Sequence, residues 1–181
     1  DPSHPFPRVL NKALCIGVHL RDEHHTFLGV VTVPRVLPRI LQLPSPTDNE
    51  YYFITMAGII QHFISDLFSG YELLGSAPFR VTRNSDLYVN EEEADNLLEE
   101  IAEQVKNRRK ADVVRLEISS TAPESLTRLL ESQFDLPAEQ LYYVNGPVNL
   151  NRVMTLYGSV NRPDLKDRPF SPVDLGLPRD P

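Results

Sequence analysis

Residues 79–98 read FRVTRNSDLYVNEEEADNLL and place a strand, a polar turn and a helix one after another. Apolar and polar residues alternate in the first four letters, which is the period-2 pattern of a half-buried strand. Asn90 is then a good helix N-cap, and Glu93 three residues later completes a capping box. Apolar residues recur after it at three- and four-residue steps and predict one buried helix face: Ala94, Leu97, Leu98, Ile101, Ala102 and Val105.

The same patterns predict a mixed set of strands and helices in the rest of the chain. The polar loop RDEHHT joins two apolar runs as in an antiparallel hairpin. The order strand, helix, strand over 79–118 permits a crossover unit, right-handed if its strands are parallel. We therefore expect an α+β domain with a mixed β-sheet packed with helices. The expected strands outside 79–98 are 14–20, 27–33, 51–54, 114–118 and 140–144, and the expected helices are 59–68, one opened by a capping box at 121–124, and 149–157.

Composition indicates one globular core in a chain of 181 residues, 41% of them apolar, with a formal net charge of −7. No apolar run is long enough to span a bilayer, and the first residues show no secretory signal. The chain does not begin with Met, so we expect a fragment of a longer protein. The single cysteine, Cys15, lies in an apolar run and is expected in the core, in keeping with a reducing cytoplasm.

Strings along almost the whole chain carry a resemblance to one known family. They are FRVTRNSDL with the EEEADNLL helix and, in order along the rest of the chain, DPSHPFP at 1–7, VPRVLPR at 33–39, LFSGYELL at 67–74, VVRLEIS at 113–119, YYVNGPVNL at 142–150 and DLKDRPFSP at 164–172. Together they resemble the middle, or head, domain of bacterial polyphosphate kinase.

The resemblance implies a fold and an organisation. The family's middle domain has an α+β fold similar to that of the phosphohistidine phosphatases. We expect an N-terminal arm at 1–12, the middle (head) domain at 13–160, and a proline-rich arm or linker at 161–181 that leads to missing catalytic domains.

The resemblance also implies a role in a larger enzyme. The intact enzyme would reversibly transfer the terminal phosphate of ATP to polyphosphate through a phosphohistidine outside this segment. Mg²⁺, ATP and polyphosphate would be bound mainly by other domains. This domain would support a dimer or higher oligomer by packing on the N-terminal domain of another subunit, in a cytoplasmic enzyme that can associate with a membrane.

No catalytic, cofactor-binding or metal-binding residue is predicted in this chain, and we expect the fragment alone to be inactive. The adjacent His24 and His25 are expected in a solvated turn, with a metal or phosphate contact as the alternative. His19 and His62 are expected to be structural residues. A Gly-rich phosphate loop is absent from the sequence.

Arg80 and Arg83 are the candidates for a phosphate or interface contact. Being three apart in a strand, they should face opposite sides, and one could meet a phosphate or a partner carboxylate through two hydrogen bonds. The alternative is that both are surface charges that pair with the acidic cluster Glu91–Glu93. Arg35 and Arg39 lie in a proline-rich loop, where a partner contact is conceivable.

Two other functions remain open on the sequence. One is a stand-alone phosphohistidine phosphatase-like hydrolase, suggested by fold analogy alone. The other is a polyphosphate-binding module. The net acidity opposes this second function, because an acidic surface repels a polyanion at long range, although a local basic patch could still bind one. No nucleic-acid partner is expected.

Overall fold

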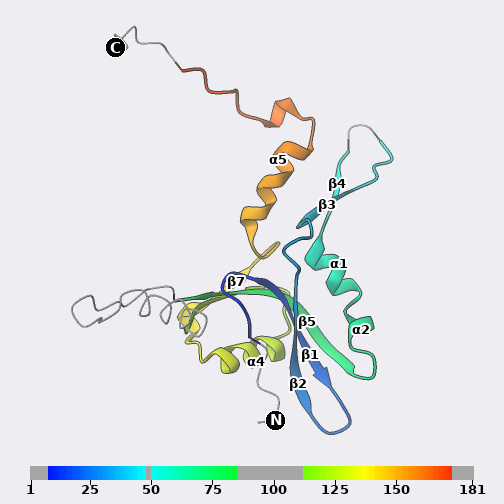
Figure 1. The fold of residues 1–181 in the computed structure, drawn as a ribbon, viewed down its shortest axis with the longest axis vertical. Helices are drawn as coiled ribbons and strands as arrows, with labels where there is room; N and C mark the ends of the chain where they lie inside the picture. The colour runs from blue at the N-terminus through cyan, green and yellow to red at the C-terminus, as the bar shows by residue number, and fades with distance from the viewer. Residues whose placement is uncertain (1–7, 48–49, 85–111, 173–181) are drawn as a thin grey trace, which may run out of the picture.

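The computed structural model describes residues 8–47, 50–84 and 112–172. A five-stranded mixed sheet forms the centre of the fold (Figure 1). The strand order is β2-β1-β5-β6-β7; the neighbours are antiparallel except β6 and β7, which are parallel. The mixed α+β architecture predicted from the sequence is therefore confirmed. The strands are β1 (Leu14–Arg21), β2 (Thr26–Thr32), β5 (Glu72–Arg83), β6 (Val113–Ser119) and β7 (Leu141–Val144).

β1 is buried on both faces of this sheet. All its residues except Arg21 are buried, because the strand lies between β2 and β5 and is covered above and below. Its even-numbered residues Leu14, Ile16, Val18 and Leu20 belong to one apolar cluster. Cys15 belongs to a second cluster, built around Phe79 and Leu116. A strand with two buried faces reads as a continuous apolar run, as LCIGVHL does.

Helices cover the two faces. Ala57 of α1 (Met56–His62) and Ile64 of α2 (Ile64–Leu67) pack in the cluster of Ile16. Leu126 and Leu130 of α4 (Glu124–Phe134) pack in the cluster of Phe79. Figure 1 shows α4 on one side of the sheet and α1 and α2 on the other.

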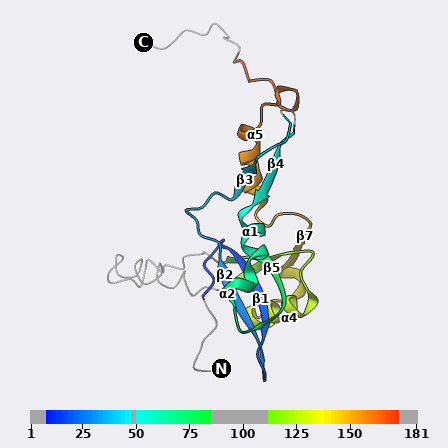
Figure 2. The ribbon, with the colours of Figure 1, turned by 90° about the vertical axis from the view of Figure 1, so that its right-hand side faces the viewer.

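A narrow arm extends from the sheet (Figure 2). It contains the two-stranded sheet of β3 (Ile40–Leu43) and β4 (Tyr52–Thr55), the 3-10 helix η2 (Leu150–Thr155) and α5 (Leu156–Ser159). The two parts of the arm come from distant segments, and the Asn161 amide donates to the Tyr51 hydroxyl at 3.3 Å. Two more 3-10 helices, η1 (Ala138–Gln140) and η3 (Pro163–Leu165), precede β7 and follow α5.

The structure corrects the expected crossover over residues 79–118. β5 and β6 are antiparallel neighbours, so the strand–helix–strand order does not form a parallel crossover unit. The helix expected from Asn90 lies outside the described residues. β5 itself is longer than the predicted strand, and the extra residues 72–78 pair with β1 alone. Pro78 is tolerated there, because this part of β5 has no hydrogen-bonding neighbour on its other side.

Two further expectations change at element boundaries. The capping box at Thr121 is wrong: α4 has Pro123 at its N-cap position, and the Thr121 hydroxyl bonds to Ser119 instead. Pro123 can pack closely against β5 because residue 75 is glycine: a Cβ at that position would lie 2.5 Å from Pro123 Cγ. β3 was not expected at all, because prolines surround it. The helix expected over 59–68 begins earlier, at Met56, and divides at Phe63.

Cys15 offers a direct test of the β1 core. Its side chain is fully buried, and burial raises the pKa of the thiol, outweighing the opposing effects of the Thr32 hydrogen bond and Arg39. We expect the native chain to resist a thiol-reactive disulfide reagent at pH 8 and to react fully once unfolded in urea. Absorbance of the released chromophore measures both rates. Comparable rates in the two states would contradict the buried placement of β1.

Candidate functional site

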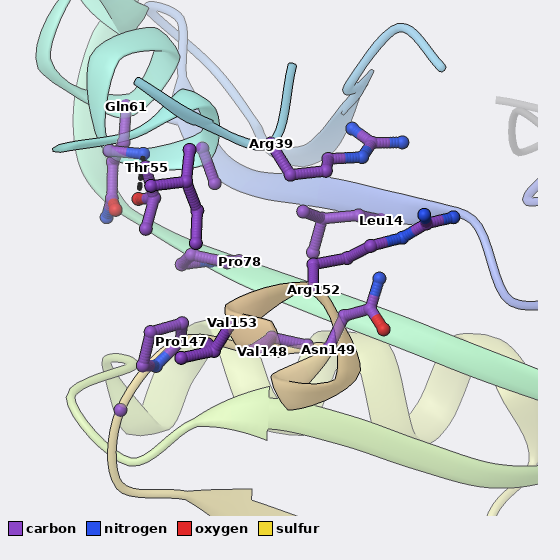
Figure 3. Close-up of a pocket in the computed structure, with 14 residues that line it drawn as sticks. Leu14, Arg39, Thr55, Gln61, Pro78, Pro147, Val148, Asn149, Arg152 and Val153 are labelled. Carbon is purple, nitrogen blue, oxygen red and sulfur yellow. Dashed lines mark hydrogen bonds between the residues drawn. The ribbon is translucent and has the colours of Figure 1, made fainter. Parts of the chain in front are cut away.

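An apolar cavity of about 230 Å³ lies where the arm meets the sheet (Figure 3). It is enclosed by residues from β1, β3, α1, β5 and the segment 146–153. We call this junction between the arm and the five-stranded sheet the seam. The lining residues are Leu14, Arg39, Ile40, Thr55, Ala57, Gly58, Gln61, Pro78, Gly146, Pro147, Val148, Asn149, Arg152 and Val153.

Local hydrogen bonds fix the walls of this cavity. The Thr55 hydroxyl accepts from the Gly58 amide at 3.0 Å and caps α1. The Gln61 amide donates to the Ser76 carbonyl at 2.8 Å, which ties α1 to β5. The chain bends at Asn145-Gly146, and Gly146 has φ +133°, a conformation that favours glycine.

A wider groove of about 700 Å³ adjoins the cavity and shares four lining residues with it, Arg39, Ile40, Asn149 and Arg152. Four of its lining side chains are cationic, and none of the lining residues is acidic. The cationic side chains come from three separate segments of the chain. The lining residues are Asn11, Lys12, Arg35, Leu37, Pro38, Arg39, Ile40, Gln42, Phe53, Asn149, Arg152, Thr155 and Ser159.

Arg39 and Arg152 concentrate positive charge at one end of the seam. Figure 3 shows their guanidinium groups pointing the same way, away from the apolar wall. Burial, together with Arg152 and Arg35, lowers the pKa of Arg39 from its ordinary value. Arg39 donates one hydrogen bond to the Val33 carbonyl at 3.2 Å. The guanidinium groups are thus close enough to repel one another.

Arg80 is held inside the molecule beside this groove. Its Nε donates to Glu117 Oε2 at 2.6 Å, directly across the β5–β6 pair, and its Nη1 donates to Asn149 Oδ1 at 2.9 Å. The Glu117 carboxylate also accepts from Arg115 at 3.4 Å. Asn149 has φ +70° and immediately precedes η2. The network therefore fixes the point at which the chain enters the arm.

Arg83 points to the other side, towards the N-terminal segment. Its Nε donates to the Val9 carbonyl at 3.1 Å, and its amide donates to Asn11 Oδ1 at 3.0 Å. Burial and the nearby Arg8 lower the pKa of Arg83, and Asp112 opposes the shift. Arg80 and Arg83 thus diverge, as their spacing predicts. A phosphate or interface contact by either stays a prediction, and the proposed partners Glu91–Glu93 lie outside the described residues.

The sequence reasoning missed Arg152 and Lys12 as groove residues. The sequence places Arg35 and Arg39 in a proline-rich loop, but nothing in it joins that loop to residues more than a hundred positions later. The segment between Gly146 and η2 brings them together, because its two positive-φ residues redirect the chain back over β3. The available signals were Gly146 and Asn149, which mark turns without naming the surface they reach.

The described histidines lie away from both the cavity and the groove. His19 is buried in β1, and its Nδ1 lies 3.1 Å from the Ser125 hydroxyl. The amides of His24 and His25 donate to Asp22, which lowers the pKa of that carboxyl, in the exposed hairpin turn. His62 is exposed against Phe63. His4 lies outside the described residues.

Within the described residues, no group of three or more His, Cys, Asp or Glu side chains is placed to hold a metal ion. Among the helices searched there, none has both the length and the apolar character to cross a bilayer. The fold and the groove define the class of protein: a mixed α+β domain with a cationic surface where its arm joins the sheet.

Comparison with known proteins identifies the family. The family model for the polyphosphate kinase middle domain matches residues 1–156. The chain is 40% identical to a polyphosphate kinase of Xylella fastidiosa over 97% of its own length and 42% identical to one of Neisseria gonorrhoeae over 95%. The chain belongs to the polyphosphate kinase middle-domain family, and it spans about a quarter (26%) of those relatives' length.

A solved structure supports the fold. The crystal structure of polyphosphate kinase from Porphyromonas gingivalis aligns with a TM-score of 0.59 over 92% of this chain and 23% of that one, at 22% identity. The likeness at this identity concerns the fold, and the sequence relatives carry the family assignment.

The Arg80–Glu117 pair should contribute to stability. In Glu117→Gln the carboxylate is lost and Arg80, largely enclosed, faces a neutral amide; we expect a loss of about 1–3 kcal/mol in the free energy of unfolding. Urea unfolding measures it. Glu124→Gln removes an exposed pair with Arg128 and should cost no more than about 0.5 kcal/mol. Equal losses in the two variants would contradict a structural role for the network.

Proposed function

We propose that this domain is a non-catalytic part of an enzyme that reversibly transfers the terminal phosphate of ATP to polyphosphate. The phosphohistidine that carries the phosphoryl group would lie outside this segment, and Mg²⁺ and ATP would be bound mainly by other domains. The family membership supports the proposal, as does the placement of the described histidines away from the cationic groove. The domain's task would be to pair subunits and hold the other domains in place.

One observation carries the assembly role: large apolar side chains are exposed along the end of the arm. Met154 is 71% exposed, Leu165 68% and Phe170 89%. An open groove of about 470 Å³ lies there and is almost wholly apolar. Its lining residues are Leu150, Val153, Met154, Leu156, Tyr157, Val160, Leu165 and Lys166. Contiguous apolar surface of this kind is typical of a contact with another protein surface.

We propose that the N-terminal domain of a second subunit covers this apolar groove. The chain spans about a quarter of its relatives, so most of the parent protein is available to cover it. We further propose that residues 13–160 form the domain, and that 1–12 and 161–181 lead towards the rest of the enzyme. A cytoplasmic setting accords with the single buried, unpaired cysteine. Membrane association of the intact enzyme stays a prediction.

A stand-alone phosphohistidine hydrolase is not favoured. Such an enzyme needs an imidazole facing a cleft with anion-binding donors. His19 is the buried histidine of the described residues, and it faces Ser125 beneath α4 rather than the cavity or the groove. The family match to a domain of a larger enzyme accounts for the chain without this activity.

The 181-residue chain should not transfer phosphate from ATP to polyphosphate. The reason is that the proposed phosphohistidine is absent from it. Incubation with radiolabelled ATP, Mg²⁺ and a polyphosphate primer, followed by separation of polyphosphate from nucleotide, measures transfer, with the intact enzyme as the positive control. Labelled polyphosphate formed by the chain alone, and lost on substitution of one of its histidines, would overturn the proposal.

A charge placed in the apolar groove of the arm should weaken subunit pairing in the intact enzyme. For Met154→Asp we expect at least a tenfold weaker association by analytical ultracentrifugation, because burial of a carboxylate without a partner is costly. The stability of the separate chain should change by less than about 0.5 kcal/mol, because Met154 is exposed there. Thr26→Asp adds the same charge at the exposed start of β2 and serves as the control. Unchanged association in Met154→Asp would exclude this surface as the interface.

A further inference from the structure

The cationic groove has a feature that packing does not require. Lys12, Arg35 and Arg152 are exposed, and Arg39 is half-buried, yet all four line one hollow. Within the described residues none of the four forms an ion pair. Elsewhere in this part of the chain, Arg21, Arg80, Arg115, Arg128 and Arg162 each pair with a carboxylate. The groove therefore gathers four described cations that form no ion pair, whereas Arg8, Lys166 and Arg168, which also form none within the described residues, lie outside it.

This gathering occurs in a chain of net charge −7. An acidic chain offers many carboxylates that would pair with exposed arginines by chance, yet the groove lining contains none. Burial, together with repulsion from Arg152 and Arg35, already lowers the pKa of Arg39. Holding like charges together costs free energy, and an anion between them would remove that cost.

The neutral lining suits the same ligand. The side-chain NH₂ groups of Asn11 and Asn149 can donate hydrogen bonds to it, whereas the Thr155 and Ser159 hydroxyls already donate to the Arg152 and Thr155 carbonyls. Asn149 is kept in place because Arg80 donates to its oxygen, which leaves the amide NH₂ group available as a donor. Guanidinium groups match phosphate oxygens through two parallel hydrogen bonds, and a lysine adds a point charge.

The number of charges separates the possible anions. A single carboxylate brings one negative charge, whereas four clustered cations suit a dense polyanion. A row of linked phosphates carries about one charge on each unit and oxygens on every side. The groove is open at the surface and large relative to the adjoining cavity, about 700 Å³ against 230 Å³, so it can receive an extended ligand.

We propose that the groove formed by Lys12, Arg35, Arg39 and Arg152 binds a short run of linked phosphate groups. This goes beyond the proposed function, in which other domains hold polyphosphate and ATP. The shared chemistry is an oligophosphate, which could come from inorganic polyphosphate or from the triphosphate of a nucleotide. The groove is a binding surface and supplies no reacting group.

Calorimetric titration of the 181-residue chain tests the proposal. The probes are orthophosphate, tripolyphosphate, long-chain polyphosphate and ATP. We expect affinity to rise from orthophosphate to polyphosphate and to fall as salt increases. ATP as tight as tripolyphosphate would assign the groove to the nucleotide's phosphates; weaker ATP binding would assign it to inorganic polyphosphate. No binding of any phosphate probe at millimolar concentration would overturn the proposal.

Matched variants locate the site. Arg152→Gln removes a side chain that forms no hydrogen bond or ion pair within the described residues, and Arg39→Gln removes a more enclosed one. Each should weaken polyphosphate binding about three- to tenfold and lower the salt slope by about 1. Arg128→Gln removes the same charge from α4, outside the groove, and should leave affinity unchanged. Thermal unfolding confirms that each variant folds. Equal effects in all three variants would overturn the assignment to the groove.

A last probe separates phosphate from an acidic protein segment. A polyglutamate of matched charge should bind more weakly than polyphosphate. Tighter polyglutamate binding would overturn the proposal in favour of a docked acidic segment. The kinase assay of the chain is independent of these titrations, so failure of the groove and failure of the proposed function are distinguishable.

Discussion

Burial of β1 on both faces is the constraint on which the rest of the structure depends. One strand contributes Ile16 to the cluster under α1 and α2, and Cys15 to the cluster under α4. Removing water from both faces of a strand is favourable by roughly 25 cal/mol per Å² of apolar surface. Because each cluster needs β1, neither helix layer has a complete core without that strand. The sheet therefore behaves as one unit, and the arm is attached to that unit at its seam.

The seam shows why a polar network belongs next to an apolar core. Leu14 of β1 lies directly opposite Arg80 of β5, and Arg80 lies opposite Glu117 of β6. The cation therefore spans the sheet at the edge of the cluster and extends to Asn149, which holds the chain in a left-handed turn before η2. An apolar contact could bury the same area, but it would not fix the direction in which the chain leaves the sheet.

Period-2 alternation and buried apolar runs predicted β1, β2 and β6 well, because their burial is visible in the sequence. β3 and the first half of β5 were missed, since Pro38, Pro44 and Pro78 oppose strands and only tertiary pairing accommodates them. The antiparallel pairing of β5 with β6 was equally hidden, because a long connection permits either direction. Two of the segments that resemble the family, 33–39 and 142–150, lie at the groove. Its assembly from residues 12, 35, 39 and 152 depends on tertiary contacts that no local sequence pattern specifies.

Net charge and local charge act over different distances, which reconciles an acidic domain with a cationic groove. At physiological ionic strength the field of exposed charges decays over about 8 Å, so distant carboxylates on an acidic chain are largely screened from a ligand in the groove. The cations of the groove, in contrast, would act on a bound phosphate at contact distance, and Arg39 is partly sheltered from water, where screening is weaker. Under the proposed binding, the acidic surface would discourage unspecific adsorption of a polyanion, and the groove would determine where it lies. Because the four cations come from three separate segments, the groove exists only in the folded chain, and an unfolded or misassembled chain would lose it.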